Sequence, residues 1–313
     1  MKVLKKIVIA VVAVLLAAVL IGGPTVYAVR GSLRGIEVTR EFTDGLDSAK
    51  TQAKKDGDVR IMSSNLLVHY KSWGGEPAKP RAAMYLELLK VYQPDVIGVQ
   101  EVSDEWFCCL NRNLPDGYKF LYPFTTGLFV NMTGLIYNSN TVTLVESGKQ
   151  EFSQGDNPRL RRVVWGVFER KADGKRFAVT STHLDLIREN KEKEQLAIMN
   201  VQSDEMIKIA EELCVKYACP VFSTGDFNAM ENGDGNGIYD APEIYEKLAA
   251  SMKDTKNMAQ KKLCGDAQGL TAPTYDHVFL TGEAEIKCYQ LLSSSYVKPL
   301  SDHFPLFIDA DIQ

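Results

Sequence analysis

From residue 59 onward the chain alternates short apolar runs with helical stretches, and this alternation limits the folds open to it. Eight apolar runs predict strands, at 59–67, 95–102, 134–137, 163–169, 177–182, 221–225, 275–280 and 305–312. Apolar residues at helical spacing predict helices over 81–92, 191–217 and 242–250. Turn residues at 172–175 and at 138–139 predict hairpins. Because strands outnumber helices and are joined partly by hairpins, we expect an α/β fold of the α+β type with mixed sheets, and not a purely parallel sheet.

The first thirty residues form an apolar segment that begins with lysines. Residues 7–21 are all Ile, Val, Ala or Leu, and 22–24 interrupt the run before a second apolar stretch. This pattern predicts either a signal peptide cleaved after Ala28 or an uncleaved membrane anchor. Basic residues at its start favour a body that faces out of the cytoplasm, whether tethered or secreted.

The domain boundaries follow from composition. We expect residues 1–30 to be the signal anchor or signal peptide, 31–58 a polar linker, and 59–313 a single domain. A short amphipathic helix over 41–55 is an alternative description of part of the linker.

Charge argues against one class of partner. The chain has 36 basic and 40 acidic residues, and four of the basic ones lie within the first thirty residues, which contain no acid. The remainder therefore carries 32 basic against 40 acidic residues. An acidic body has no general electrostatic attraction to nucleic acid, so the sequence gives no strong evidence for duplex DNA as a partner. No protein partner is indicated.

Polar side chains terminate several of the predicted strands. The residues at or just after these ends are Asn65, Glu101, His183, Asp226 and Asn228, and the segments 275–277 and 301–303 add Asp276, Asp302 and His303. Rigid strands can aim their last side chains into one crevice, so we expect these residues to meet.

The chemistry of this set is that of phosphoester hydrolysis. Carboxylate and amide oxygens suit Mg²⁺, whereas no set of thiolates or histidines suits zinc. A histidine beside an acid can exchange a proton during attack or departure. Such residues could polarise a phosphate ester and position water for in-line attack.

Six segments resemble, in order, the motifs of the endonuclease/exonuclease/phosphatase superfamily, the DNase I-like proteins. They are 62–66, 100–102, 182–185, 225–229, 276–279 and 301–305, and the likeness spans residues 59–313. The superfamily includes DNase I-like nucleases, neutral sphingomyelinases and inositol polyphosphate 5-phosphatases. The resemblance implies a four-layer α/β/β/α sandwich, two mixed β-sheets flanked by helices, with the site at one edge of the sheets.

The resemblance also implies a metal site. Glu101 corresponds to the principal Mg²⁺ ligand, with Asn65 beside it, and Mn²⁺ is a possible substitute. Asp302 corresponds to a residue that helps to hold metal or water.

The same resemblance implies catalytic roles. Asp226 corresponds to the residue that orients or deprotonates water, and Asn228 and His183 to residues that contact the substrate phosphate. His303 corresponds to the catalytic histidine, oriented by Asp276.

Other polar residues are less clearly assigned. Arg161 and Arg162 precede a strand, and one of them, for which we choose Arg162, is a candidate for binding substrate phosphate; the alternative is an exposed basic turn. We expect His277 to point away from the site, since adjacent strand residues face opposite ways. His69 is expected in a surface loop, and Asp185 fits a turn or helix cap as well as a site.

Residues 232–243 have the spacing of a twelve-residue calcium loop, with Gly237 at the sixth position. The first position is Asn232, which removes a charge from the usual pattern. A Ca²⁺ site is therefore one hypothesis, and a glycine-rich surface loop is the other.

Together these features predict a Mg²⁺-dependent phosphodiesterase that hydrolyses a phospholipid or nucleic-acid type diester outside the cytoplasm. The stretch after Glu101 is acidic where DNase I-like nucleases tend to carry a basic residue, and the inositol phosphatase motifs are not matched. With a phospholipid as substrate this activity would be sphingomyelinase-like. The alternatives are a phosphomonoesterase acting on inositol phosphate-like or other soluble phosphate esters, and a non-catalytic binding module on the same fold.

Overall fold

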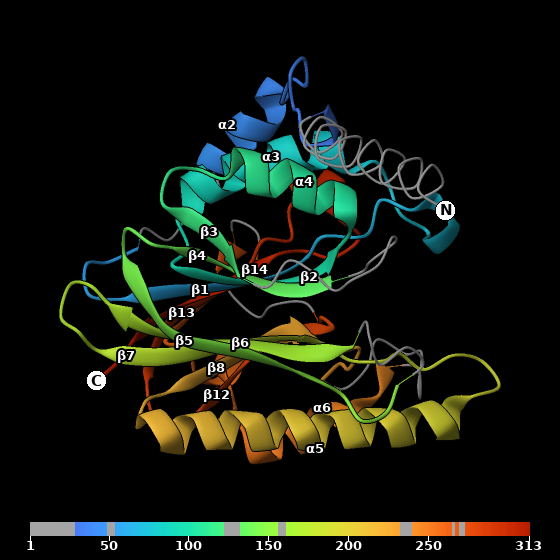
Figure 1. Cartoon of the computed structure of the whole chain (residues 1–313), viewed down its shortest axis with the longest axis vertical. Helices are drawn as coiled ribbons and strands as arrows, with labels where there is room; N and C mark the ends of the chain where they lie inside the picture. Colours follow the sequence, from blue (N-terminus) through green and yellow to red (C-terminus); the bar gives the residue numbers. More distant parts are fainter. Residues whose placement is uncertain are drawn as a thin grey trace, which may run out of the picture.

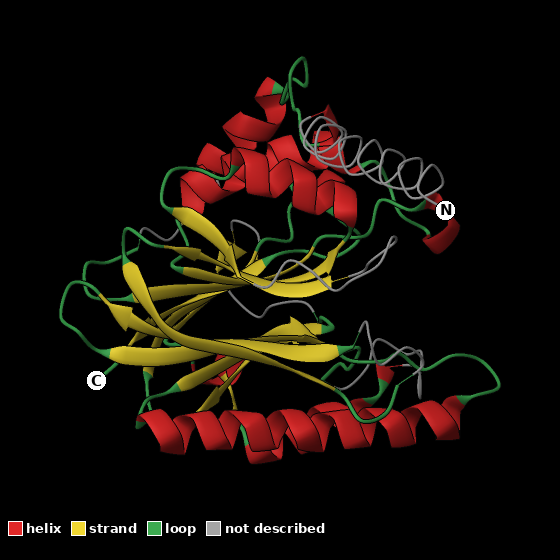
Figure 2. Ribbon diagram, viewed as in Figure 1, coloured by secondary structure: helices red, strands yellow, loops and turns green. Residues whose placement is uncertain are grey.

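Two β-sheets face each other, and helices cover their outer faces, so the chain forms four layers in the order α/β/β/α (Figures 1 and 2). The structure is a computed structural model that describes residues 29–48, 54–121, 132–155, 161–231, 240–264, 267–268 and 273–313. This architecture confirms the predicted sandwich of two mixed sheets flanked by helices.

The first sheet has the strand order β11-β10-β13-β14-β1-β2-β4-β3 in the described residues. Its central strands β1 and β2 are parallel, while β14 and β4 flank them in antiparallel fashion. The bounds are β1 Val59–Asn65, β2 Val96–Val102, β3 Tyr118–Leu121, β4 Met132–Asn138, β10 Lys261–Cys264, β11 Ala267–Gln268, β13 Glu285–Leu291 and β14 Leu306–Asp311.

The second sheet has the order β5-β6-β7-β8-β12-β9. Strands β7 and β8 are parallel, and β12 runs antiparallel to β8. The bounds are β5 Val142–Glu151, β6 Arg162–Arg170, β7 Arg176–His183, β8 Val221–Asp226, β9 Lys253–Asp254 and β12 Asp276–Thr281.

The helices form the two outer layers (Figure 1). The first sheet is covered by α2 Arg40–Ser48, α3 Ala78–Tyr92 and α4 Asp104–Asn113, and the second by α5 Glu192–Tyr217 and α6 Pro242–Ser251. The short helices are α7 Thr255–Met258, η1 Lys71–Trp73 and η3 Lys298–Leu300.

Each of the three interfaces between layers has its own apolar core. Trp106 and Tyr85 lie under the helices of the first sheet, Phe227 and Phe279 under α5 and α6, and Phe177 between the two sheets. Each helical layer thus buries one apolar face and each sheet buries both, which is the condition for a stable layered fold.

The side chains that face between the sheets change in character along the central strands. Ile61, Val96, Val179 and Phe222 form an apolar row, since these residues pair across β1 and β2 and across β7 and β8. Two residues further along, the paired positions are Ser63 with Gly98 and Ser181 with Thr224. The core between the sheets therefore becomes small and polar before the strands end.

Gly98 allows the sheets to approach each other closely in this polar row. A Cβ atom at Gly98 would lie 1.8 Å from Oγ1 of Thr224 in the opposite sheet. Only glycine fits there without a shift of one strand.

The predicted helices and strands agree with the structure, with ends displaced by a few residues at most. One predicted hairpin, at 172–175, joins β6 to β7 and is confirmed. The hairpin predicted at Asn138 and Ser139 is wrong: β4 pairs in the first sheet and β5 in the second, so this turn carries the chain from one sheet to the other.

The segment predicted as a polar linker contributes a helix to the first layer. Phe42 and Leu46 of α2 are buried in the same core as α3 and Leu300. The amphipathic alternative for this segment therefore describes residues 40–48 better than a spacer does.

Within the ranges described above, no helix has the length and apolar character needed to cross a membrane. Residues 1–28, which make up nearly all of the N-terminal segment predicted as signal or anchor, lie outside the described residues. That prediction is untested.

Candidate active site

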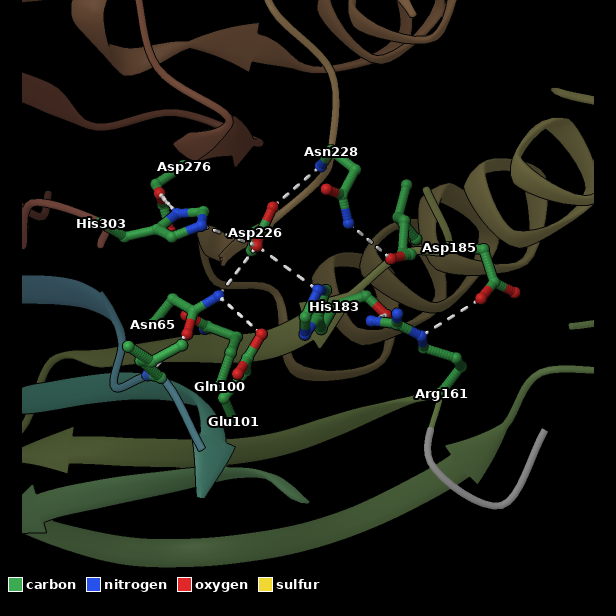
Figure 3. Close-up of polar contacts among 12 residues, drawn as sticks. Asn65, Gln100, Glu101, Arg161, His183, Asp185, Asp226, Asn228, Asp276 and His303 are labelled. Carbon is green, nitrogen blue, oxygen red and sulfur yellow. Dashed lines mark hydrogen bonds and ion pairs between the residues drawn. The ribbon is translucent and has the colours of Figure 1, made fainter. Parts of the chain in front are cut away.

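The predicted site residues meet because strand pairing aligns their strand ends. Asn65 pairs with Gln100 across β1 and β2, and Asp226 of β8 pairs with both His183 of β7 and Asp276 of β12. These positions continue the inward-facing rows of the two sheets, so their side chains turn toward one another at one edge of the sandwich (Figure 3).

Glu101 reaches the same place through an irregular backbone. The pairing of β2 with β4 shifts register after Val99, and Glu101 has φ 58°, in the left-handed region. In a regular strand Glu101 would face away from Gln100, but here its carboxylate accepts a hydrogen bond from the backbone of Val68 at 2.9 Å and lies 3.4 Å from the amide nitrogen of Asn65. A non-glycine residue in this conformation is uncommon and is typical of functional sites.

Asp226 is the centre of the polar contacts (Figure 3). Its Oδ2 accepts a hydrogen bond from Asn65 at 2.9 Å and lies 3.3 Å from Nε2 of His183 and 3.7 Å from Nε2 of His303. Its Oδ1 accepts the backbone N–H of Asn228 at 2.9 Å. Two N–H donors and two histidine rings thus surround one buried carboxylate.

His303 is oriented by Asp276, as the resemblance implied. Nδ1 of His303 lies 2.6 Å from Oδ2 of Asp276, which leaves Nε2 directed toward Asp226. His303 precedes β14, whose residue Leu306 pairs with Ser63 of β1, so the segment before β14 ends at the same edge as Asn65.

Asn228 lies in the site, but strand alternation does not place it there. The strand ends at Asp226, and Asn228 has φ 48°. Its amide nitrogen donates to the backbone oxygen of Leu184 at 2.9 Å, immediately after His183. The local turn therefore orients Asn228, whereas the sequence predicted this orientation from an extended chain that continues through residue 228.

The two histidines of the site have opposite electrostatic environments. Burial lowers the pKa of His183 far below its ordinary value, and the nearby Arg161 and His303 lower it further. Burial also acts to lower the pKa of His303, but the carboxylates of Asp276 and Asp226 outweigh it and raise that pKa to about 11. At neutral pH His183 is neutral and His303 carries a proton on both nitrogens.

The carboxylates of the site are also perturbed. Burial raises the pKa of Asp226, while the charge of His303 opposes this shift. Burial is likewise the main cause that raises the pKa of Glu101, and the negative charges of Asp226 and Asp302 add to it. Several negative charges therefore lie close together where water is largely excluded.

The donor set fits a magnesium ion. Mg²⁺ usually binds one or two carboxylates and keeps several waters, and Glu101 with Asn65 offers such oxygen ligands. Two buried acceptors nearby, Oε1 of Gln100 and Oδ1 of Asp276, have no hydrogen-bond partner in the described part of the chain, as expected where metal-bound water would donate. Over the same residues no cluster of three or more His, Cys, Asp or Glu side chains has the arrangement of a protein-only metal cage.

Asp302 lies at the rim of the site. It is exposed, its Oδ1 accepts from the hydroxyl of Ser301 at 3.2 Å, and its charge contributes to the raised pKa of both Glu101 and His303. No described contact joins its carboxylate directly to Glu101 or Asn65.

Of the two candidate arginines, the structure brings Arg161 to the site. Arg161 lies 3.2 Å from Asp185 and donates to the backbone oxygen of His183 at 3.4 Å (Figure 3). Arg162, the residue chosen from the sequence, forms an ion pair with Glu151 at 3.8 Å, and no described contact joins it to the cluster. The two are neighbours at the start of β6, so their side chains leave the backbone in different directions.

Asp185 is a buried part of the support behind His183 and not an exposed cap. Gln202 of α5 donates to its Oδ2 at 2.8 Å and accepts its backbone N–H at 2.9 Å. Neither Gln202 nor the buried Gln100, which donates to Ser181 at 3.0 Å, was assigned from the sequence. The only sequence signal for these two residues is a glutamine at a core-facing position of an otherwise apolar helix face or strand. Such a side chain would be buried and would need hydrogen-bond partners.

The remaining histidines lie apart from the cluster. His277 faces α6, with Nε2 2.8 Å from the backbone oxygen of Ala229 and its ring beside Tyr245, as expected from alternation. His69 lies in a loop, as expected, and is partly buried there, with Nδ1 2.6 Å from the hydroxyl of Ser103.

The calcium hypothesis concerns residues that lie mostly outside the described ones. Residues 232–239 are not described, and within the remainder Asp240 is buried and accepts a hydrogen bond from Tyr275 at 2.9 Å. The hypothesis is untested.

No protein-family model and no curated protein matches this sequence. Solved structures do match its fold. An endonuclease/exonuclease/phosphatase from Bacteroides vulgatus has 21% identity and a TM-score of 0.64, over 82% of this chain and 99% of its own. A mannosyl-6-phosphatase from Bacteroides thetaiotaomicron has 19% identity and a TM-score of 0.63, over 80% and 99%. The human Nocturnin catalytic domain, with a bound sulfate anion, has 21% identity and a TM-score of 0.61, over 83% and 96%. The chain therefore has the fold of the endonuclease/exonuclease/phosphatase proteins, as the motifs implied.

Proposed function

We propose that the chain is a Mg²⁺-dependent phosphoesterase that uses water to hydrolyse its substrate at this edge of the sandwich. The observation that carries the proposal is the convergence of Asn65, His183, Asn228 and His303 on the buried carboxylate of Asp226, with Glu101 alongside. Neighbours with the same fold are named as phosphatase and nuclease-type proteins, which supports this class of reaction.

Asp226 is the group proposed to orient and deprotonate the attacking water. Burial raises its pKa above that of an ordinary carboxyl, which makes it a stronger base than a solvent-exposed aspartate. The surrounding N–H donors hold the carboxylate in one orientation, so its lone pairs are directed before substrate arrives.

His303 is proposed to stabilise the charge that accumulates on the phosphate oxygens. Asp276 accepts a hydrogen bond from Nδ1–H of His303, so Nε2–H is directed into the site. The raised pKa of His303 keeps the ring cationic at neutral pH. His183 stays neutral and donates a hydrogen bond without a charge. The two histidines therefore contribute different interactions to the same phosphate.

Glu101 and Asn65 would hold the magnesium ion, with Asp302 adding negative charge nearby. When bound, the ion supplies Lewis-acid polarisation of the phosphate and neutralises its charge. The residues of the chain keep this region buried and supply the oriented donors around it.

A phosphodiester remains the leading substrate class and a phosphomonoester the second. The mannosyl-6-phosphatase neighbour favours the second class, because that name describes a monoesterase on this fold. Arg161, beside His183, is the closer of the two arginines to the cluster in the described residues and is the candidate of the two to contact the phosphate. It replaces Arg162 as the proposed phosphate-binding arginine.

The proposed location outside the cytoplasm rests on the sequence of residues 1–30 alone. Cell fractionation together with sequencing of the mature N-terminus tests it. A chain found in the cytoplasm with the segment intact would contradict the proposal, and a free chain that begins after Ala28 would identify a cleaved signal.

The activity is tested with bis(p-nitrophenyl) phosphate as diester and p-nitrophenyl phosphate as monoester, with Mg²⁺ and after chelation. We expect chelation to abolish turnover and His303→Ala to reduce kcat by about 10² to 10³, the usual cost of removing a donor placed where negative charge develops. The ratio of the hydrolysis rates of the two substrates then distinguishes a diesterase from a monoesterase.

His277→Gln is the matched control, since His277 follows Asp276 directly but faces the opposite core. It should retain nearly all activity. Turnover that survives both chelation and His303→Ala would refute the proposed enzyme, and a folded protein that turns over neither substrate would favour a binding module.

A further inference from the structure

One buried arginine outside the catalytic cluster contacts both loops that carry predicted metal ligands. Arg81 lies in the first turn of α3 and is 5% exposed. Among the described residues, its guanidinium donates to backbone oxygens alone: those of Pro77 at 3.2 Å, Leu66, Leu300 at 3.1 Å, Leu67 at 2.9 Å, Val68 at 3.2 Å and Glu76 at 2.5 Å.

Three of these oxygens belong to the loop that follows Asn65. In that loop the N–H of Val68 donates to the carboxylate of Glu101 at 2.9 Å, and the N–H of Leu67 donates to Oδ1 of Asn65 at 3.0 Å. Arg81 therefore binds the carbonyl side of a loop whose N–H side holds the two predicted metal ligands.

The oxygen of Leu300 belongs to the second loop. Leu300 ends η3 and directly precedes the segment that contains Asp302 and His303. Both loops also line a cavity of about 590 Å³, to which Leu67, Ser301 and Arg81 itself contribute. Beside this cavity the hydrogen bonds of Arg81 link the two loops directly.

From this geometry we infer that Arg81 is a positioning residue that sets the affinity of the metal site by fixing two loops: the one that holds Asn65 and Glu101, and the one that bears Asp302. The inference rests on the proposed function for the presence and the identity of the metal ion. Outer contacts of this kind typically change metal affinity by about 10- to 100-fold when removed.

The chemistry of the contacts requires arginine at this position. A guanidinium has five N–H donors in a fixed plane, which serve six carbonyl oxygens here with one donor shared. A lysine ammonium has three donors, so Arg81→Lys would leave about half of these oxygens without a partner. The charge is retained at neutral pH, because burial lowers the pKa of Arg81 only to about 10.

Two neighbouring contacts support the same loop. Arg81 lies over the ring of Trp106 at 5.0 Å, and Nε1 of Trp106 donates to the oxygen of Leu67 at 2.8 Å. Trp106→Phe removes this hydrogen bond and keeps an aromatic ring under the guanidinium. It is therefore a milder change at the same place.

The test is Mn²⁺ binding to the full chain, measured by electron paramagnetic resonance, together with the Mg²⁺ concentration that gives half-maximal activity. We expect Arg81→Lys to weaken both by about 10-fold or more, and Trp106→Phe to weaken them in the same direction by less. If Arg81→Lys does not fold, the Trp106→Phe result decides alone.

Arg60→Lys is the matched control. Arg60 is 2% exposed, pairs with both oxygens of Asp309 at 2.7 Å, and lies over Phe307 at 4.2 Å, at the far end of β1 from Asn65. It should destabilise the fold without a change in Mn²⁺ affinity.

A folded Arg81→Lys or Trp106→Phe protein with wild-type affinity for Mn²⁺ would overturn the inference, as would an equal loss in Arg60→Lys. If the wild-type chain itself binds neither Mn²⁺ nor Mg²⁺, the proposed function fails instead, which is a separate outcome.

Discussion

At the scale of single residues, neighbouring groups differ sharply in protonation because their surroundings differ. His183 and His303 both approach the same oxygen of Asp226, yet burial leaves the first neutral and two carboxylates keep the second charged. Titratable groups whose pKa values are pushed apart in one pocket are typical of acid–base sites.

Replacing Glu101 tests the metal site directly. Glu101→Gln removes the negative charge of the proposed ligand and keeps its size, so we expect the Mg²⁺ concentration for half-maximal activity to rise by about 10-fold or more, since ligand charge sets affinity in such sites. Steady-state rates over a Mg²⁺ titration measure this. An unchanged Mg²⁺ dependence would exclude Glu101 as a ligand.

His277 should limit stability in acid. Burial lowers its pKa below 6.5, so the folded state holds a neutral ring while the unfolded state gains a proton as the pH falls below that value. The contribution of His277 to the free energy of unfolding is therefore fully present above pH 6.5. It is lost as the pH falls below that value, with a slope of up to about 1.4 kcal/mol per pH unit.

Urea unfolding between pH 7 and pH 5 measures this contribution. The free energy of unfolding should fall more steeply in the wild type than in His277→Gln, while His183 titrates in both proteins. Parallel pH profiles for the two proteins would show that His277 contributes nothing.

Residue types at strand ends were enough to predict which side chains meet, but not how each is aimed. The register shift and positive φ that turn Glu101 inward depend on the pairing of β2 with β4. The choice between Arg161 and Arg162 depends in the same way on where β6 begins, which the sequence does not mark.

At the scale of elements, the inter-sheet core determines how closely the strand ends approach. Gly98 and Thr224 meet across the two sheets one row before the site. Any side chain larger than hydrogen at position 98 would separate β2 from β8, and with them Glu101 from Asp226.

Gly98→Ala should therefore destabilise the fold by about 1 to 3 kcal/mol, the usual cost of overpacking, and reduce activity as well. Combining it with Thr224→Ala removes the clashing oxygen. The double variant should be less destabilised than the sum of the two single variants in chemical unfolding. Strict additivity would show that the two residues do not interact.

Strongly patterned elements were predictable from the sequence, whereas elements without clear periodicity, exposed or buried, were not. The helix α5 and the buried central strands have clear periodicity, whereas the edge strand β5 is mostly exposed and shows no apolar alternation. The ten-residue helix α4 was also missed, since its buried residues form one short cluster, Trp106 to Leu110. Whether a turn joins strands of one sheet or of two, as at Asn138, depends on tertiary pairing.

At the scale of the whole molecule, the folded unit begins before the apolar strands do. Because α2 buries Phe42 and Leu46, we expect a chain of residues 59–313 to be less stable than one of residues 29–313 by about 3 to 6 kcal/mol, the value of two buried apolar side chains. Thermal and urea unfolding of the two chains measure the difference. Equal free energies of unfolding for the two chains would indicate that residues 29–58 act only as a linker.

The central claim is that side chains from both sheets form one Mg²⁺-dependent phosphoesterase site around Asp226. Anomalous diffraction from crystals grown with Mn²⁺ and inorganic phosphate tests it most directly. We expect a manganese peak bound by Glu101 and Asn65, with phosphate between it and the two histidines, His183 and His303. A manganese peak bound elsewhere, or phosphate that avoids both histidines, would contradict it.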